Sequence, residues 1–197
     1  QRADVIVANQ SGISVNGGGF INASKGILTT GTPVFNNNGG IDSYRVQGGN
    51  VSIDGAGLDM RTTDYGAILS RAVQVNAGIW ANELKVITGA NQVDATSLNN
   101  DTKPTVTPLA ASGNAPAFAL DVAAIGGMYA NKIYLIGTEA GLGVRNAGTL
   151  SASDALVLSN NGWLSNTGAV QAQGDVQIAT QGDVSNAGTL YAGANQS

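Results

Sequence analysis

The sequence NAGTL at residues 146–150 returns as NTGAV at residues 166–170 and again as NAGTL at residues 186–190. The pattern therefore recurs with a fixed 20-residue period. The segments between these anchors keep the same spacing, because alanine stands at positions 152, 172 and 192. A fixed period of this length is typical of stacked architectures, in which each unit buries its apolar face against its neighbours.

One 20-residue unit has room for three short strands, near residues 148–152, 155–159 and 163–166. Apolar residues alternate with polar ones along each segment, which favours strands. Three strands joined by turns form one coil, and stacked coils pair each strand in parallel with its copies. We predict an all-β parallel β-helix, with about ten coils if the period held throughout. The inward positions are Leu150, Ala152, Leu156, Leu158 and Leu164.

Asparagine begins each repeat, so Asn146, Asn166 and Asn186 are expected to lie above one another. Stacked asparagine side chains can exchange amide hydrogen bonds along the axis. Alternatively, an Asn-x-Gly sequence simply suits a tight turn. We predict a structural ladder of these asparagines, accompanied by the turn glycines Gly148, Gly168 and Gly188.

The preceding part of the chain repeats less regularly. Residues 80–87, WANELKVI, resemble residues 129–136, YANKIYLI. Residues 90–121 between them fit no coil period and hold every proline except Pro33. We predict that this segment leaves the β-helix as an extra hairpin or a long loop, where solenoid proteins often carry function.

Composition excludes several classes of function. The chain has no cysteine and no histidine, which excludes thiol nucleophiles, histidine bases and ordinary zinc sites. Its net charge is −4 and its nine basic residues are scattered, which argues against a nucleic-acid partner. We expect no metal, no cofactor and no catalytic residue.

Acidic residues recur every five positions at Asp54, Asp59 and Asp64, close to Arg61. Such a cluster could serve a β-helix lyase or hold calcium. We favour solvated turns, because aspartate is a common turn residue.

Three other side chains allow two interpretations. Arg71 is either an outward strand residue or one half of an ion pair, with Glu83 as the suggested partner, that fixes a loop on the rod. Trp80 and Trp163 could mark a ligand surface, because exposed aromatic residues are favoured anchors. We favour packing of each tryptophan against a loop or a neighbouring coil, with Trp163 pointing outward.

Residues 9–22, NQSGISVNGGGFIN, resemble the filamentous hemagglutinin and hemolysin exoproteins of two-partner secretion. The same likeness extends over LTTG 28–31, ILSRA 68–72, NAGIWA 76–81, GGMYA 126–130, LIGTEAG 135–141 and VRNAG 144–148. The resemblance implies a right-handed β-helix that leaves a Gram-negative bacterium through an outer-membrane β-barrel transporter with periplasmic peptide-binding domains. Members include adhesins, hemolysins and the stalks of contact-dependent growth inhibition toxins.

By this resemblance, residues 1–143 are the later part of the secretion domain and residues 144–197 are the first regular repeats. The family's Asn-Pro-Asn-Gly-Ile motif reads NQSGI here. Asn9, Gly12 and Ile13 therefore carry over as candidates for transporter recognition or early folding. The family's cap is expected to precede this sequence, and without it the first coil would present an edge that invites end-to-end self-association.

The expected function is that of a secreted, non-enzymatic bacterial surface protein with its outer-membrane transporter as partner. One alternative is a carbohydrate- or receptor-binding module, with residues 90–121 and the tryptophans as its surface and a host or neighbouring-cell receptor as partner. A less favoured alternative is a polysaccharide lyase or hydrolase.

Overall fold

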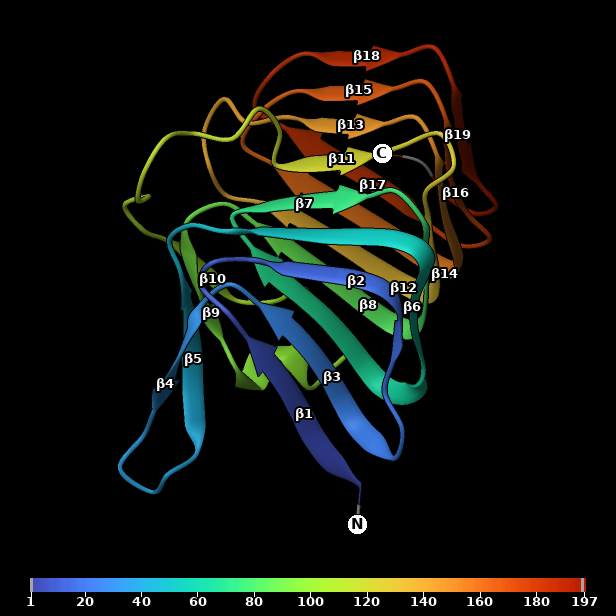
Figure 1. Ribbon diagram of the computed structural model, residues 1–197. Helices are drawn as coiled ribbons and strands as arrows, with labels where there is room; N and C mark the ends of the chain where they lie inside the picture. Colours follow the sequence, from blue (N-terminus) through green and yellow to red (C-terminus); the bar gives the residue numbers. More distant parts are fainter. Residues whose placement is uncertain (1, 196) are drawn as a thin grey trace.

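A computed structural model describes residues 2–195 and 197. Parallel strands wind around one axis and stack into a β-helix, as predicted (Figure 1). Four long strands turn corners: three of them contribute to two faces each, and the longest, of 21 residues, contributes to all three. These are β6 (Asn50–Ser70), β8 (Gly78–Thr88), β12 (Gly127–Gly137) and β14 (Thr149–Asn160).

Shorter strands complete the three faces. One face continues with β1 (Ala3–Ala8) and β3 (Ala23–Thr29) at one end and β17 (Val176–Thr180) at the other. A second contains β2 (Ile13–Gly19), β7 (Ala72–Val75), β11 (Leu120–Val122), β13 (Val144–Asn146), β15 (Leu164–Asn166) and β18 (Val184–Asn186). The third ends with β16 (Ala169–Ala172) and β19 (Thr189–Ala192).

The 20-residue register is confirmed in the C-terminal coils. Leu150 pairs with Val170, and Val170 with Leu190; Leu164 likewise pairs with Val184. The similarity between residues 80–87 and residues 129–136 also reflects strand pairing, since Trp80 pairs with Tyr129 and the register continues after a bulge. All five predicted inward residues, Leu150, Ala152, Leu156, Leu158 and Leu164, are buried in one continuous apolar core.

The expectation of about ten coils is wrong. Within the described residues each face is seven strands deep; the first, for example, consists of β1, β3, β6, β8, β12, β14 and β17. Fewer coils form because two long segments leave the helix. They build a second, antiparallel sheet from β4 (Thr32–Phe35), β5 (Ile41–Val46), β9 (Asn91–Asp94) and β10 (Val106–Pro108), in the order β10-β9-β5-β4.

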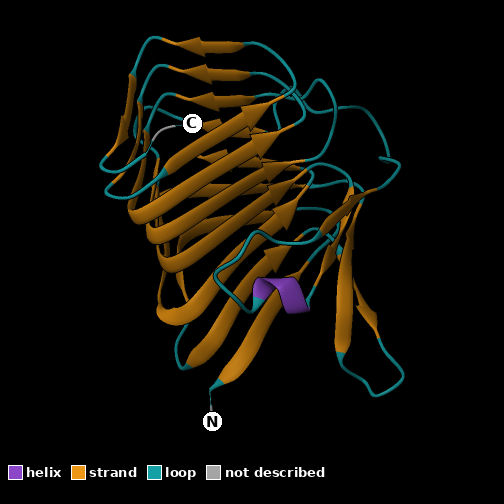
Figure 2. Ribbon diagram, turned by 180° about the vertical axis from the view of Figure 1, so that it is seen from behind, coloured by secondary structure: helices purple, strands orange, loops and turns teal. Residues whose placement is uncertain are grey.

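The chain leaves the helix after β8, as predicted for residues 90–121, and rejoins it at Leu120; the excursion forms half of a sheet whose other half is a hairpin of residues 32–46. Figure 2 shows this sheet standing beside the rod, with the short helix η1 (Thr96–Leu98) lying against the rod strands. No helix in the described part of the chain is long and apolar enough to cross a membrane.

A second apolar cluster lies between this sheet and the rod. Ile27, Leu69, Ile87 and Ile136 point out of the rod, and Tyr44, Val46, Val93 and Leu98 cover them. Rod strands at this level are therefore buried on both faces. That is why they carry apolar doublets such as Ile68-Leu69 and Val86-Ile87 rather than strict alternation.

Candidate functional site

The turn that carries the family-like motif connects β1 to β2. The backbone carbonyl of Asn9 accepts a hydrogen bond from the Gly12 amide at 3.1 Å, and Oδ1 of Asn9 accepts one from the Ser11 amide at 3.0 Å. These two bonds define a tight turn with an Asx cap. Gly12 has φ +127°, and a Cβ there would lie 3.0 Å from the carbonyl oxygen of Asn50. Glycine is therefore required by both conformation and space.

Neighbouring segments fix the position of this turn. The Asn9 amide donates to the carbonyl of Thr29 at 3.0 Å, and Nε2 of Gln10 donates to Oγ1 of Thr32 at 2.6 Å. Gln10 stands where the family motif has proline, so a side-chain hydrogen bond takes over part of the restraint that the ring would supply. The turn itself remains exposed at the surface.

Ile13 begins β2 directly after the turn, and its half-buried side chain packs against the main core. It lines an open apolar depression of about 330 Å³ at this end of the rod, together with Val7, Val15 and Phe20. Among the described residues, β1 pairs with β3 and β2 pairs with β6, so each has one unpaired edge. The structure thus brings Asn9, Gly12 and Ile13 together at the N-terminal end of the rod.

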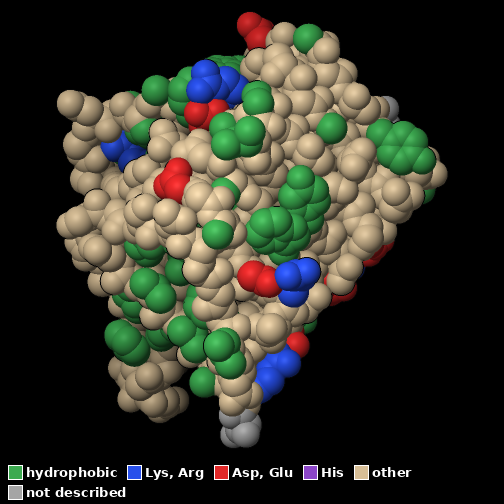
Figure 3. All heavy atoms as spheres, turned by 45° about the vertical axis from the view of Figure 1, so that its right-hand side comes forward, with side chains coloured by type: hydrophobic (Ala, Val, Ile, Leu, Met, Phe, Trp, Pro, Cys, Tyr) green, Lys and Arg blue, Asp and Glu red, His purple; other side chains and the backbone are tan. Residues whose placement is uncertain are grey.

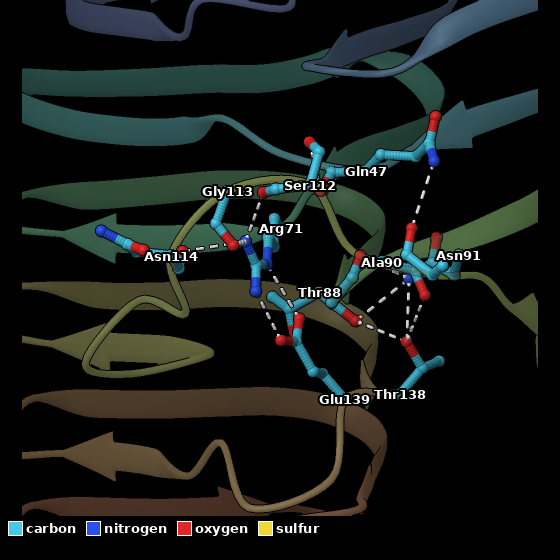
Figure 4. Close-up of polar contacts among 12 residues, drawn as sticks. Gln47, Arg71, Thr88, Ala90, Asn91, Ser112, Gly113, Asn114, Thr138 and Glu139 are labelled. Atoms are coloured by element: carbon cyan, nitrogen blue, oxygen red, sulfur yellow. Dashed lines mark hydrogen bonds and ion pairs between the residues drawn. The ribbon is translucent and has the colours of Figure 1, made fainter.

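Arg71 docks the 90–121 segment on the rod. Its guanidinium makes two hydrogen bonds to the Glu139 carboxylate, at 3.0 and 2.7 Å, and donates to the carbonyls of Ser112 and Asn114 at 2.7 and 2.9 Å (Figure 4). Arg71 is buried, and its hydrogen bonds hold the pKa of Glu139 below the usual value. The expected loop-fixing ion pair is present, but Glu83 was the wrong partner, because Glu139 is brought close only when β12 stacks on β8, two coils on from Arg71.

Lys85 fixes the other part of the same segment, a role that the sequence did not suggest. Its ammonium donates to the carbonyl of Ser97 at 2.8 Å and to that of Asn100, and lies 5.9 and 5.8 Å from the ring centroids of Tyr65 and Tyr134. The side chain is completely buried, and burial lowers its pKa to about 8. Lys85 lies between the inward residues Leu84 and Val86, so its side chain points to the outer face of the strand, which the 90–121 segment covers. This position was the one indication in the sequence that Lys85 could contact that segment.

The C-terminal asparagines form a continuous column. Nδ2 of Asn146 donates to Oδ1 of Asn166 at 2.8 Å, and Nδ2 of Asn166 donates to Oδ1 of Asn186 at 2.7 Å. Each amide also reaches a carbonyl of the next coil, Ala169 and Thr189 respectively, at 3.2 Å. Gly148, Gly168 and Gly188 accompany them, and a Cβ on Gly168 would lie 2.0 Å from the carbonyl oxygen of Gly148. The glycines therefore permit close stacking of the turns.

The three regularly spaced aspartates do not converge. Asp59 pairs with Arg61 at 2.6 Å, Asp64 pairs with Arg2 at 2.6 Å, and Asp54 accepts a hydrogen bond from Asn76. No group of three or more acidic residues that could hold a metal ion occurs in the described residues. The spacing of five residues therefore does not bring these three carboxylates to a common site.

Both tryptophans pack as the favoured interpretation predicts. Trp163 lies edge-on to Phe118 of the excursion, with ring centroids 5.8 Å apart, and its ring covers Gly143 of the preceding coil. Trp80 lies beside Tyr129 of the next coil, with centroids 6.2 Å apart and an interplanar angle of 14°.

Comparison with known proteins agrees with this architecture. A family model described as the TPS secretion domain matches residues 1–178. Toxin CdiA of Yersinia pestis is 46% identical over 197 residues, which is 99% of this chain and 6% of the toxin. The tRNA nuclease CdiA-2 of Burkholderia pseudomallei (strain 1026b) is 46% identical over 163 residues, covering 82% of this chain and 5% of that protein.

A crystal structure of the filamentous hemagglutinin secretion domain superposes with a TM-score of 0.87 at 32% identity, covering all of this chain and 68% of that one. The chain spans about a twentieth of the length of the curated relatives that it matches. On the family match and the shared fold together, this chain belongs to the TPS (two-partner secretion) secretion-domain family.

Proposed function

We propose that this chain directs the export of a large exoprotein through a partner outer-membrane transporter to the bacterial surface, and that it then serves as the template on which the exoprotein folds. The observation that carries the proposal is the continuous parallel pairing from β1 to β19, in which each coil presents a hydrogen-bonding edge to the next. Because a new coil meets a ready edge, folding outside the cell can propagate along the axis and bias export outward.

The Asn9–Ile13 turn is the proposed recognition or early folding element. It is exposed and precedes every completed coil. Its geometry depends on the side-chain oxygen of Asn9, which accepts from the Ser11 amide, and on a glycine at position 12. Its role in transporter engagement rests on the family motif that it matches in three positions.

The test is an export assay of the exoprotein that contains this chain, coexpressed with its transporter. Asn9→Ala and Gly12→Val should each sharply lower the amount of protein at the cell surface and in the medium. Thr167→Ala, in an exposed turn of the regular coils, should leave export unchanged. Undiminished export of both N-terminal variants would refute the assigned role of the turn.

The domain boundary at residues 143 and 144 is part of the proposal. Leu120 pairs with Val144, an interval longer than the repeat period. Val144 pairs with Leu164, and Leu164 pairs with Val184, so both of these intervals equal the period of the C-terminal repeat. The regular repeat therefore begins at Val144. Residues 1–143 would act as the secretion part, and residues 144–197 as the start of the projecting stalk.

The parent protein is proposed to be a contact-dependent growth inhibition effector, because the curated relatives in the match are CdiA toxins. This secretion domain itself would be non-enzymatic. The unpaired edges of β1 and β2 are proposed to support end-to-end self-association of the isolated chain. Sedimentation analysis at increasing concentration tests this, and a concentration-independent monomer would exclude it.

A further inference from the structure

Two aromatic rings lie flat on the outer surface of the rod. A Cβ on Gly78 would lie 2.4 Å from both Cζ2 and Cη2 of Trp80, and a Cβ on Gly127 would lie 2.7 to 2.9 Å from Oη, Cε2 and Cζ of Tyr129. Each ring therefore rests on the backbone of the glycine two positions before it in its own strand. Tyr129 keeps 37% of its surface exposed, and Trp80 is half-buried.

The two rings form one surface. Trp80 and Tyr129 are register partners on the adjacent strands β8 and β12, and their planes differ by only 14°. The surface around them is mainly neutral: on this side of the rod, Figure 3 shows a compact hydrophobic patch surrounded by uncharged side chains and backbone, with an acidic and a basic side chain next to it. We call Trp80 and Tyr129 the aromatic platform.

Polar groups continue the same row on both sides of the platform. Asp59 is the register partner of Trp80 on one side, and its exposed carboxylate is paired with Arg61. Ser151 and then Gln171 follow Tyr129 on the other side, with Nε2 of Gln171 donating to Oγ of Ser151 at 3.2 Å. The row thus has an apolar flat centre, with hydrogen-bond donors and acceptors at both ends.

We propose that the aromatic platform binds a neutral, β-linked oligosaccharide lying along the axis of the rod. A pyranose with equatorial hydroxyls has a flat face of C–H groups that stacks on an aromatic ring, and a rim of hydroxyls for side chains like those of Asp59, Arg61 and Ser151. Strands are spaced about 4.8 Å apart, close to the length of one pyranose unit, so successive sugars meet successive strands.

Nucleic-acid bases also stack on aromatic rings. A phosphate backbone, however, would meet a chain of net charge −4. Polyanionic glycans meet the same repulsion, so the chemistry of the row selects a neutral sugar chain. This site is separate from the Asn9–Ile13 turn, so sugar binding and export can fail independently.

Intrinsic fluorescence offers a direct test, because the chain has two tryptophans. In a Trp163→Phe background, Trp80 is the sole tryptophan and reports on the platform. Titration of this variant with cellotetraose or chitotetraose should give a saturable change in emission. Maltotetraose, whose α-linkages twist the chain, and a thymidine oligonucleotide should give none.

Calorimetric titration of variants then locates the site. Trp80→Ala and Tyr129→Ala should each weaken binding roughly tenfold or more, the loss expected for one stacking partner. Gly127→Ala should also weaken it, because the added methyl group lifts the Tyr129 ring while keeping the aromatic side chain. Trp163→Phe should bind like the wild type, and circular dichroism melts should show all four variants folded.

Three results would overturn the proposal. These are no saturable signal with either β-linked sugar, equal or stronger binding of maltotetraose or the oligonucleotide, and unchanged sugar binding by folded Trp80→Ala and Gly127→Ala variants.

Discussion

The regular coils from Val144 onward and the earlier coils that carry the second sheet are stabilised in different ways. In the regular coils the buried polar side chains are asparagines, Asn146, Asn160 and Asn166. In the earlier coils two buried cations, Arg71 and Lys85, hold an inserted segment. Where the sequence repeats, each coil supplies the partner of the next. Where it does not, long-range contacts must fix the structure.

This difference also concerns the order of folding. Asn146 finds its partner Asn166 in the very next coil, whereas Arg71 finds Glu139 across a much longer stretch of chain. The excursion can therefore reach its final dock only after the coil that contains β12 has formed. We expect the regular coils to add one at a time and the earlier coils to consolidate together.

The largest expected effect comes from the core that both regions share. Leu158 is 1% exposed and lies in the main apolar cluster. Leu158→Asp should bury an unpaired charge and abolish stable folding, with a loss of several kcal/mol, about 4 or more. Val157→Asp, one position along on the outer face, is the control. Urea unfolding measures both, and equal losses would contradict the inside–outside register.

A smaller but still large effect should follow in the earlier coils when Arg71 loses its partner. Glu139→Gln leaves the guanidinium buried without a compensating charge, which typically costs about 3 kcal/mol or more. Arg145 and Asp121 form an ion pair at 2.7 Å in which Arg145 is about half exposed. Asp121→Asn should therefore cost far less, about 1 kcal/mol at most. Similar losses for the two variants would show that the buried Arg71–Glu139 pair stabilises the fold no more than an ion pair at the surface.

The contribution of Glu139 should depend on pH. Because its folded-state pKa is lowered, its stabilisation is present above the unfolded value of about 4.3 and is lost as pH falls through the folded pKa. The difference in unfolding free energy between wild type and Glu139→Gln should therefore shrink between about pH 6 and pH 3. A difference that stays constant over this range would contradict the assigned ion pair.

Lys85 should make stability rise with pH as well, but in the alkaline range instead of the acidic one. Its folded pKa of about 8 lies below the unfolded value, so the unfolded chain binds more protons above that pH and stability rises with pH. Between about pH 8 and 9.5 the wild type should gain on the order of 2 kcal/mol relative to Lys85→Met. Lys103→Met, at an exposed lysine, should keep the wild-type slope. A flat wild-type profile would refute the buried-cation assignment.

The regular region could be predicted almost completely from the sequence. The segments expected at 148–152, 155–159 and 163–166 correspond to β14 and β15, because equivalent residues one period apart must pair. The candidate residues Asn9, Gly12 and Ile13 could be found through a short motif, since they are neighbours in the chain.

The earlier region could be predicted only in part, for a physical reason. The hairpin of β4 and β5 has no copy elsewhere in the sequence, and its pairing with β9 joins Ser43 to Asp94, which lie far apart in the chain. The hydrogen-bond partners of Arg71 and Lys85 are likewise determined by tertiary packing, and no regular interval in the sequence indicates them. The apolar doublets Ile68-Leu69 and Val86-Ile87 were the one local sign that a second layer covers these strands.

The smallest expected effect tests the asparagine ladder of the regular coils. Asn166 is 1% exposed, accepts from Asn146 and donates to Asn186, so Asn166→Ala removes its two hydrogen bonds within the column and its bond to the Thr189 carbonyl. We expect a loss of about 1 to 2 kcal/mol in unfolding free energy by urea titration, since each net hydrogen bond contributes about 1 kcal/mol. Asn186→Ala is the matched control, because Asn186 is exposed and its substitution removes only the last bond of the column. A cost for Asn166→Ala no larger than that for Asn186→Ala would mean that the turn sequence alone, without the ladder, sets the stability of the repeat.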